Sequence, residues 1–270
     1  MGSAADDRHT ATTPREIAEG VFWLALGRGL LSSANVFFVR WEAGWCLMDA
    51  GWAHDAPAIL GAAEYLFGRE RPSTVLLTHA HPDHVGALPE LARRWEVRAW
   101  IHAAELPLAL GDARAIRHYA GPLDRWAILP ALRLAGRARM ERTLARSSLH
   151  DEVRALAHGV GLPSLPGWEA IPTPGHTPGH VAFLRSADRV AVTGDALVTL
   201  DLNSPLKLLR RERTLAGPPW ITTWSWPAAT ASAVRLAGLR PSVIAAGHGV
   251  PLAGAEATAH LQEFLRVRSA

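Results

Sequence analysis

Residues 79–84 read HAHPDH, so three histidines and one aspartate lie within a single short segment. The apolar segment 73–78 comes directly before it and predicts a buried strand that ends at His79. Polar side chains gathered at one strand end cost on the order of several kcal/mol unless a partner satisfies them. Imidazole and carboxylate groups are ligands that suit zinc, iron and similar ions. The segment therefore predicts a metal site.

Three later segments carry further potential ligands. These are His176 within TPGHTPGH at 173–180, Asp195 within TGDA at 193–196, and His248 within AGHG at 246–249. Each follows an apolar stretch of strand character, at about 168–171, 189–192 and 242–245. Four strand ends can therefore deliver metal ligands to one rim.

The order HxHxDH, then a histidine, an aspartate and GHG, resembles the metallo-β-lactamase-fold hydrolases, in particular their glyoxalase II-like and lactonase-like branch. The resemblance extends from about residue 19 to about residue 252. It implies an α/β (α+β) fold: an αββα sandwich of two mixed β-sheets flanked by helices. The alternation of apolar strand-like and helix-like segments is compatible with that sandwich but does not by itself predict it.

The resemblance also implies a ligand set. One divalent ion would be held by His79, His81 and His176, and a second by Asp83, His84 and His248, with Asp195 bridging the two. Zinc is the expected metal, with iron and manganese as alternatives. A hydroxide that bridges the ions would attack the substrate, and Asp83 would act both as a ligand and as a catalytic acid or base. Asp49 would support the metal loop, and His180 would lie behind the ligands.

This ligand set implies a dinuclear hydrolase of an ester, lactone or thioester of a small, partly apolar substrate. β-Lactam hydrolysis is disfavoured as the native role, because the cysteine-ligand β-lactamases need a thiolate where this chain has Asp195. Two alternatives stay open. One is a mononuclear iron enzyme resembling the persulfide dioxygenases; the other is a non-catalytic metal-binding scaffold whose partner binds the basic patch at 114–146, which has eight arginines against two acidic residues.

The composition is that of an ordinary globular protein, with 49% hydrophobic and 20% charged residues. There is no apolar run of the roughly 18 residues that a membrane helix needs, and no signal peptide is recognised, so a cytoplasmic location is expected. The net charge of +3 is not taken as a sign of nucleic-acid binding; a small-molecule substrate is expected, and a homodimer stays open. The single cysteine, Cys46, predicts a buried thiol rather than a metal ligand.

The pattern along the chain predicts a frayed N-terminal tail at 1–13 and one domain at 14–270. Strands are expected at 20–26, 35–41, 45–49 and 97–101, and helices at 56–68, 85–95 and 255–267. A helical insertion at about 103–166, with a helix over 123–145, can form a lid over the substrate pocket. The candidate pocket residues are Tyr119, Trp126, Ile128, Leu129 and Leu132 from the insertion, and Trp220 and Trp224 from a Trp-rich loop. The alternative for these side chains is ordinary core packing.

Overall fold

The strands form two large mixed sheets. The computed structural model describes residues 13–27, 33–134, 148–149, 152–156, 162 and 164–269. Within these residues, one sheet has seven strands that follow one another in sequence order. They are β1 (Arg15–Ala18), β2 (Val21–Leu26), β3 (Ala34–Trp41), β4 (Gly44–Met48), β5 (Thr74–Leu76), β6 (Ala99–His102) and β7 (Val153–Leu156). Strands β1 to β4 pair antiparallel, and β4 to β7 pair parallel.

The second sheet has five strands, of which only the pair β10 and β13 is parallel within the described residues. In spatial order they are β14 (Leu252–Ala253), β13 (Val243–Ala246), β10 (Val190–Gly194), β9 (Val181–Arg185) and β8 (Trp168–Pro172). A separate ribbon pairs β11 (Val198–Leu200) with β12 (Arg213–Ala216). The sequence predicts four strands that end just before metal ligands. All four are present, as β5, β8, β10 and β13.

Alternating side chains divide the core into layers. Along β3, Val36 and Phe38 point to one face, whereas Phe37 and Val39 point to the other, as the two-residue period of a strand requires. Phe37 packs with Phe183 of the second sheet in the layer between the sheets. Cys46 is buried in the same layer, as predicted. The two sheets therefore pack face to face.

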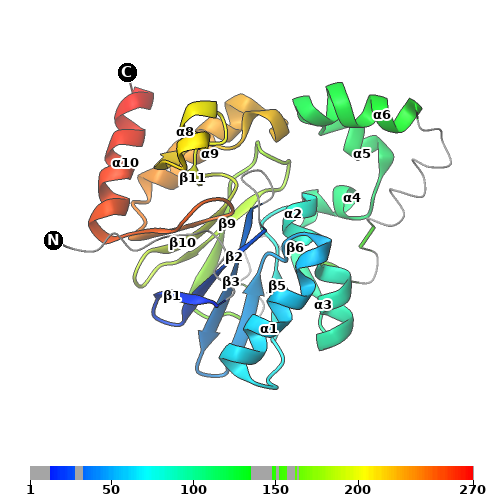
Figure 1. The fold of residues 1–270 in the computed structure, drawn as a ribbon, viewed down its shortest axis with the longest axis vertical. Helices are drawn as coiled ribbons and strands as arrows, with labels where there is room; N and C mark the ends of the chain where they lie inside the picture. Colours follow the sequence, from blue (N-terminus) through cyan, green and yellow to red (C-terminus); the bar gives the residue numbers. More distant parts are fainter. Residues whose placement is uncertain are drawn as a thin grey trace.

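Helices cover both outer faces of this sandwich (Figure 1). On the seven-stranded sheet lie α1 (Ala56–Phe67) and α3 (Leu88–Trp95), and on the five-stranded sheet lie α9 (Trp226–Gly238) and α10 (Gly254–Ser269). Trp45 of β4 stacks on Phe67 of α1, with ring centroids 4.4 Å apart. The predicted αββα architecture is confirmed.

The helix predicted over 85–95 begins three residues later than predicted, and a separate short helix precedes it. A short helix α2 (Pro82–Val85) carries Asp83 and His84, and α3 begins only at Leu88. The backbone N–H of Gly86 donates to the carbonyl of Gly51 (2.8 Å) rather than to its own helix. A Cβ at Gly86 would lie 2.5 Å from Ala53 N, so only glycine allows the segments to pack this closely. This packing breaks the helix next to the metal loop.

The insertion is a series of short helices that projects above the sandwich (Figure 1). It contains the turn η2 (Ala103–Glu105), α4 (Leu106–Ala109), α5 (Ala113–His118), the π-helical η3 (Asp124–Ile128) and α6 (Leu129–Leu134). The helix predicted over 123–145 is thus a π-helical turn followed by α6, and its remainder lies outside the described residues, as does the predicted tail except Thr13. The remaining short elements are η1 (Ala53–Asp55), α8 (Pro205–Arg210) and η4 (Trp220–Thr222). Among the described helices, none has the length and hydropathy needed to cross a membrane.

Candidate metal centre

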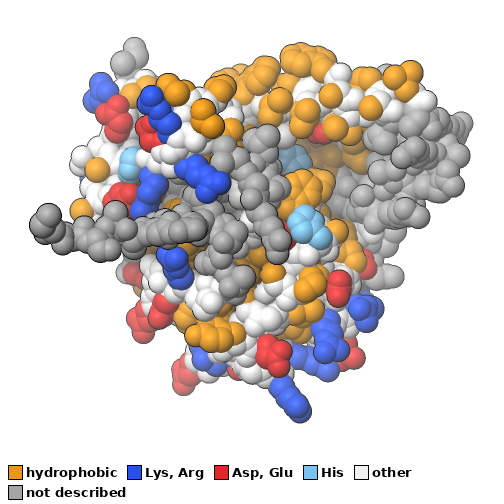
Figure 2. All heavy atoms as spheres, viewed as in Figure 1, with side chains coloured by type: hydrophobic (Ala, Val, Ile, Leu, Met, Phe, Trp, Pro, Cys, Tyr) orange, Lys and Arg blue, Asp and Glu red, His pale blue; other side chains and the backbone are white. Residues whose placement is uncertain are grey.

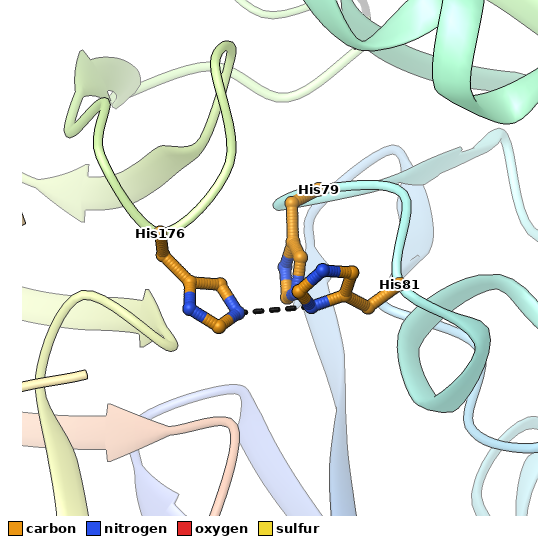
Figure 3. A group of neighbouring side chains, drawn as sticks. All are labelled: His79, His81 and His176. Atoms are coloured by element: carbon orange, nitrogen blue, oxygen red, sulfur yellow. Dashed lines mark hydrogen bonds between the residues drawn. The ribbon is translucent and has the colours of Figure 1, made fainter. Parts of the chain in front are cut away.

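The seven predicted metal ligands lie together, because the loops that carry them follow strand ends of the two sheets and meet there. Three of the histidines, His79, His81 and His176, place one ring nitrogen each within 4.8 Å of the others. His81 Nδ1 and His176 Nε2 are 2.9 Å apart. Figure 3 shows the three rings converging, with His79 and His81 from one loop facing His176 from another. We call these residues the three-histidine group.

Asp83, His84 and His248 form a second set whose ligand atoms also lie within 4.8 Å of one another, which we call the mixed group. Asp83 Oδ2 is 3.4 Å from His248 Nε2 and 3.8 Å from His84 Nε2. The mixed group shares no residue with the three-histidine group. A third set, His79, His84 and Asp195, takes one histidine from each group, so the two groups lie next to each other.

Asp195 lies between the two sets. Its Oδ2 is 3.3 Å from His176 Nε2 and 3.3 Å from His248 Nε2, and its Oδ1 is 3.4 Å from His84 Nε2. The carboxylate fits here because Gly247 has no side chain. A Cβ at Gly247 would lie 2.4 Å from Asp195 Oδ1. Asp195 thus lies within 3.4 Å of a histidine of each group.

A hydrogen-bonded chain orients His79 and His84. His84 Nδ1 lies 2.8 Å from Asp49 Oδ2 and must donate to it, because a carboxylate only accepts. Thr78 Oγ1 donates to the same Asp49 oxygen (2.9 Å), so it accepts from His79 Nδ1 at 3.0 Å. Both rings therefore carry their proton on Nδ1 and leave the Nε2 lone pair for a metal.

The same arrangement recurs at the other two strand-end histidines. Thr223 Oγ1 donates to the carbonyl of Pro219 (2.6 Å) and therefore accepts from His176 Nδ1 at 3.1 Å. His248 Nδ1 lies 2.6 Å from the carbonyl oxygen of Ser33 and donates to it. In four histidines a hydrogen bond thus holds the Nδ1 proton, so Nε2 is the atom that each ring would offer to a metal.

His180 is close to the centre but has a different role. Its Nε2 accepts the backbone N–H of Asp195 (3.0 Å), and its Nδ1 lies 2.7 Å from Thr173 Oγ1. Burial, helped by the nearby His84 and His81, lowers the pKa of His180 to about 3, against the opposing effect of Asp195. A neutral His180 therefore supports the segment that carries Asp195, as its place outside the ligand pattern implied.

The chemistry of the site fits divalent metal ions. His79 Nε2, His84 Nε2 and Asp195 Oδ1 are buried polar atoms without a hydrogen-bond partner among the residues that the structure describes. An unsatisfied buried group costs about 1–3 kcal/mol. Burial, together with neighbouring histidines, holds the pKa of His79 well below its ordinary value. Neutral, unpaired imidazole nitrogens beside carboxylates are what a cation needs from its ligands.

The carboxylates of the centre also stabilise positive charge on the neighbouring histidines. Burial by itself would lower the pKa of His248, but Asp195 and Asp83 outweigh it and raise that pKa to about 10. The pKa of His84 is raised in the same sense by Asp49, Asp83 and Asp195, against the effect of burial. A bound cation would supply the same compensating charge, and it would leave the histidines neutral.

A cavity of about 400 Å³ opens beside His81. Its wall is mainly apolar and comes from α2, α3 and the insertion. It includes Trp52, Val85, Pro89, Leu108, Ala109, Ala113, Ile116, Tyr119, Ile128, Leu129 and Leu149, with Arg117 and Asp124 as charged members. Of the predicted pocket residues, Tyr119, Ile128 and Leu129 therefore line it. The side chain of Leu132 lies outside the described part of the chain.

The predicted tryptophans occupy other places. Trp126 and Trp220 are exposed, and their ring centroids lie 6.2 Å apart. Trp224 packs edge-on against Tyr119 at 4.9 Å. None of the three is among the described residues that line the cavity. Figure 2 shows hydrophobic side chains along the upper edge of the molecule, where Figure 1 places α6.

Sequence reasoning did not identify Thr78, Thr223 or Glu105 as parts of the site. Thr78 lies two residues after the end of β5, and its place beside His79 was the only signal. Thr223 lies in the Trp-rich loop, where no local spacing links it to His176. Glu105 lies in the turn η2 and is fully buried, and burial raises its pKa against the effect of the N–H groups of Gly179 and Ala80.

Comparisons with known proteins agree with this arrangement. The model of the metallo-beta-lactamase superfamily matches residues 30–248. Probable metallo-hydrolase YflN of Bacillus subtilis is 32% identical over 255 residues, which cover 92% of this chain and 91% of that protein. The crystal structure of TTHA1623 in a di-iron-bound form is 26% identical, with a TM-score of 0.57, over 91% of this chain and 96% of that chain.

A more distant structure shares the fold alone. AidC, a dizinc quorum-quenching lactonase in complex with a product, N-hexanoyl-L-homoserine, is 17% identical, with a TM-score of 0.62, over 87% of this chain and 90% of that chain. The family match covers most of the chain, and the metallo-hydrolase relative spans nearly its full length. This chain therefore belongs to the metallo-beta-lactamase superfamily and is a metal-dependent hydrolase.

Proposed function

We propose that this enzyme is a dinuclear hydrolase that cleaves the ester, lactone or thioester bond of a small, partly apolar substrate. The observation that carries the proposal is the presence of two separate ligand groups with Asp195 between them. Zinc is the proposed ion, because nitrogen and carboxylate ligands suit it, and iron and manganese are the alternatives. Of the two structural relatives, one is a dizinc protein and the other was solved in a di-iron-bound form, which supports a two-ion centre.

Two bound divalent ions would polarise a substrate carbonyl and make water a nucleophile at neutral pH. The chain would supply the proton transfer through Asp83. Burial by itself would raise the pKa of Asp83, but His84 and His248 outweigh burial and hold that pKa well below its usual range. An ionised Asp83 can accept the proton of the attacking water and return it to the leaving group. Its side chain is 17% exposed, against 4% for Asp195, so Asp83 is the more accessible carboxylate.

The cavity beside His81 supports the choice of substrate. Its apolar wall suits an acyl or other hydrocarbon chain, whose carbonyl end would then lie near the ligand groups. AidC is a lactonase of the same fold with an N-acyl product, so an acyl lactone is the first substrate to test. We place Tyr119 in the pocket wall beside the substrate, and we propose that Trp126, Trp220 and Trp224 form the pocket's outer rim.

Elemental analysis of protein purified without added metal tests the proposal, followed by hydrolysis assays on esters, lactones and thioesters. We expect two equivalents of divalent metal per chain and loss of hydrolysis in His84→Ala, because the mixed group loses a ligand. His54→Ala is the control, since its side chain is 71% exposed and lies outside both groups. One equivalent of iron, with activity that His84→Ala leaves intact, would contradict the proposal and favour a mononuclear iron enzyme.

A further inference from the structure

Glu105 is a fully buried carboxylate that belongs to neither ligand group. It ends the turn η2, directly after β6 and before α4, where the insertion begins. A buried carboxylate needs hydrogen-bond donors on both oxygens, since otherwise its charge is left uncompensated. The donors that it has therefore show what Glu105 holds in place.

The two oxygens of Glu105 accept backbone N–H groups from two different loops. Oε2 accepts from Ala80 (2.9 Å), which lies between His79 and His81. Oε1 accepts from Gly179 (2.6 Å), which lies in the loop of His176. The first loop follows β5 of the seven-stranded sheet, and the second connects β8 and β9 of the five-stranded sheet. One side chain thus ties together the loops from the two sheets that carry the three-histidine group.

Gly179 allows this contact because it has no side chain. A Cβ at this position would lie 2.6 Å from His102 Nδ1 and 3.0 Å from the backbone nitrogen of Glu105. His102 Nδ1 in turn accepts the N–H of Ala104 (3.2 Å), which fixes the turn η2 against the loop. The close approach of loop and turn is therefore part of the same arrangement.

We propose that Glu105 is a positioning residue that sets the distance between the His81 loop and the His176 loop, and thereby the metal affinity of the three-histidine group. The mixed group depends on other supports, because Asp49 orients His84 and the carbonyl of Ser33 orients His248. The effect of Glu105 is therefore selective for one of the two groups. This inference rests on the two-ion centre of the proposed function.

Substitution by glutamine tests the inference with little change of volume. Glutamine has one acceptor oxygen, whereas Glu105 uses two, so Glu105→Gln can hold one loop but not both. The full-length protein, stripped of metal, is titrated with Zn²⁺ in competition with a chromophoric chelator. His248→Ala leaves the three-histidine group intact, and His176→Ala leaves the mixed group intact. Glu105→Gln is added to each of these backgrounds.

In the His248→Ala background we expect Glu105→Gln to weaken Zn²⁺ binding about 10- to 100-fold, the usual effect of losing a residue that supports metal ligands. In the His176→Ala background we expect no change. Asp55→Asn is the matched control, because Asp55 is another buried carboxylate that accepts a backbone N–H, that of Trp52 (2.9 Å). It should leave Zn²⁺ affinity unchanged in both backgrounds.

Gly179→Ala provides a second, independent variant that displaces the loop and leaves the carboxylate in place. Gly179→Ala should lower the Zn²⁺ affinity of the three-histidine group. If Glu105→Gln does not fold, the Gly179→Ala variant tests the inference alone. Equal weakening of both groups, in step with a lower melting temperature of the metal-free protein, would show a merely structural role and overturn the inference. Unchanged Zn²⁺ affinity in both backgrounds would also overturn it. A wild-type protein that binds fewer than two Zn²⁺ ions would instead contradict the proposed function.

Discussion

Asp49 Oδ2 lies 2.8 Å from His84 Nδ1, and both side chains are completely buried. The same carboxylate accepts the backbone N–H of Thr78 (2.8 Å) and its hydroxyl (2.9 Å). Because Thr78 also contacts His79, one buried aspartate orients a histidine in each of the two ligand groups. Asp49 has a left-handed backbone, with φ of 60°, a conformation that aspartate and asparagine tolerate better than most residues.

Asp49→Asn should therefore weaken metal binding without straining the backbone. The amide can donate to His84 Nδ1, which would move the ring proton to Nε2, where it would block the metal. We expect about 10- to 100-fold lower metal affinity, measured by Zn²⁺ titration. Asp188→Asn is the control, because Asp188 is an exposed carboxylate that pairs with Arg185. Wild-type affinity in Asp49→Asn would mean that this hydrogen bond does not set the tautomer.

Gly247 tests how tightly the backbone packs around Asp195. Its N–H donates to Gly194 O (2.8 Å) and its carbonyl accepts from Asn35 N (2.9 Å), so it cannot move away easily. A new Cβ would lie 2.4 Å from Asp195 Oδ1, and we expect Gly247→Ala to lose metal and about 1–3 kcal/mol of stability.

Gly61 is the matched glycine for this experiment. It lies exposed in α1, and a Cβ there would have no atom of the described residues within 4 Å. Gly61→Ala should increase stability by about 0.5–1 kcal/mol, because glycine is unfavourable inside a helix. Chemical denaturation measures both changes; equal effects of the two substitutions would rule out the steric explanation at Gly247.

Removal of metal should lower the melting temperature. An ion present at about 100 times its dissociation constant stabilises the folded protein by roughly 2.7 kcal/mol, which corresponds to a shift of roughly 5–10 °C for a chain of this size. Thermal unfolding with and without a chelator measures the shift, and added Zn²⁺ should reverse it. The chelated protein must first be shown to have lost its metal. If its melting temperature is then unchanged, the result argues against buried metal ligands.

The metal-free protein should lose stability as the pH rises from about 7 to 10. Against the effect of burial, Asp195 and Asp83 raise the pKa of His248 to about 10 in the folded state, whereas an unfolded histidine has a pKa of about 6.5. Because the pKa of His248 is higher in the folded state, its protonation stabilises the folded protein fully at pH values below the pKa of the unfolded state. This stabilisation is lost as the pH rises through the pKa of the folded state. Melting curves of chelated protein across this range test the sign; rising stability would contradict it.

Filling the cavity should affect substrate binding but not the metal. Ala113 lines the cavity, and Ala113→Phe should raise KM for long-chain acyl substrates more than for short ones. Metal content should stay at the wild-type level, because Ala113 is not one of the ligand residues. Ala127→Phe is the control, since Ala127 is exposed in the neighbouring η3. A similar rise for short and long chains would exclude this cavity as the chain-binding site.

The sequence by itself determined which residue types could bind metal and where the main strands and helices lie. The HAHPDH segment and the three later ligands each follow a strand. Short apolar runs, such as the one that β3 buries on both faces, make these strands recognisable from the sequence. The break between α2 and α3 escaped this reasoning, because it depends on Gly86 packing against residues that are distant in sequence.

Only the tertiary structure decided how the ligands are oriented and supported. Thr223 lies 47 positions from His176, Glu105 lies 74 positions from Gly179, and Ser33 lies 215 positions from His248. Local periodicity reports the backbone geometry and burial of a segment, but the partner of a ring nitrogen depends on which distant segment packs against it. For the same reason the sequence could propose Tyr119 and Trp126 together, whereas the packing of the insertion places only Tyr119 in the cavity wall.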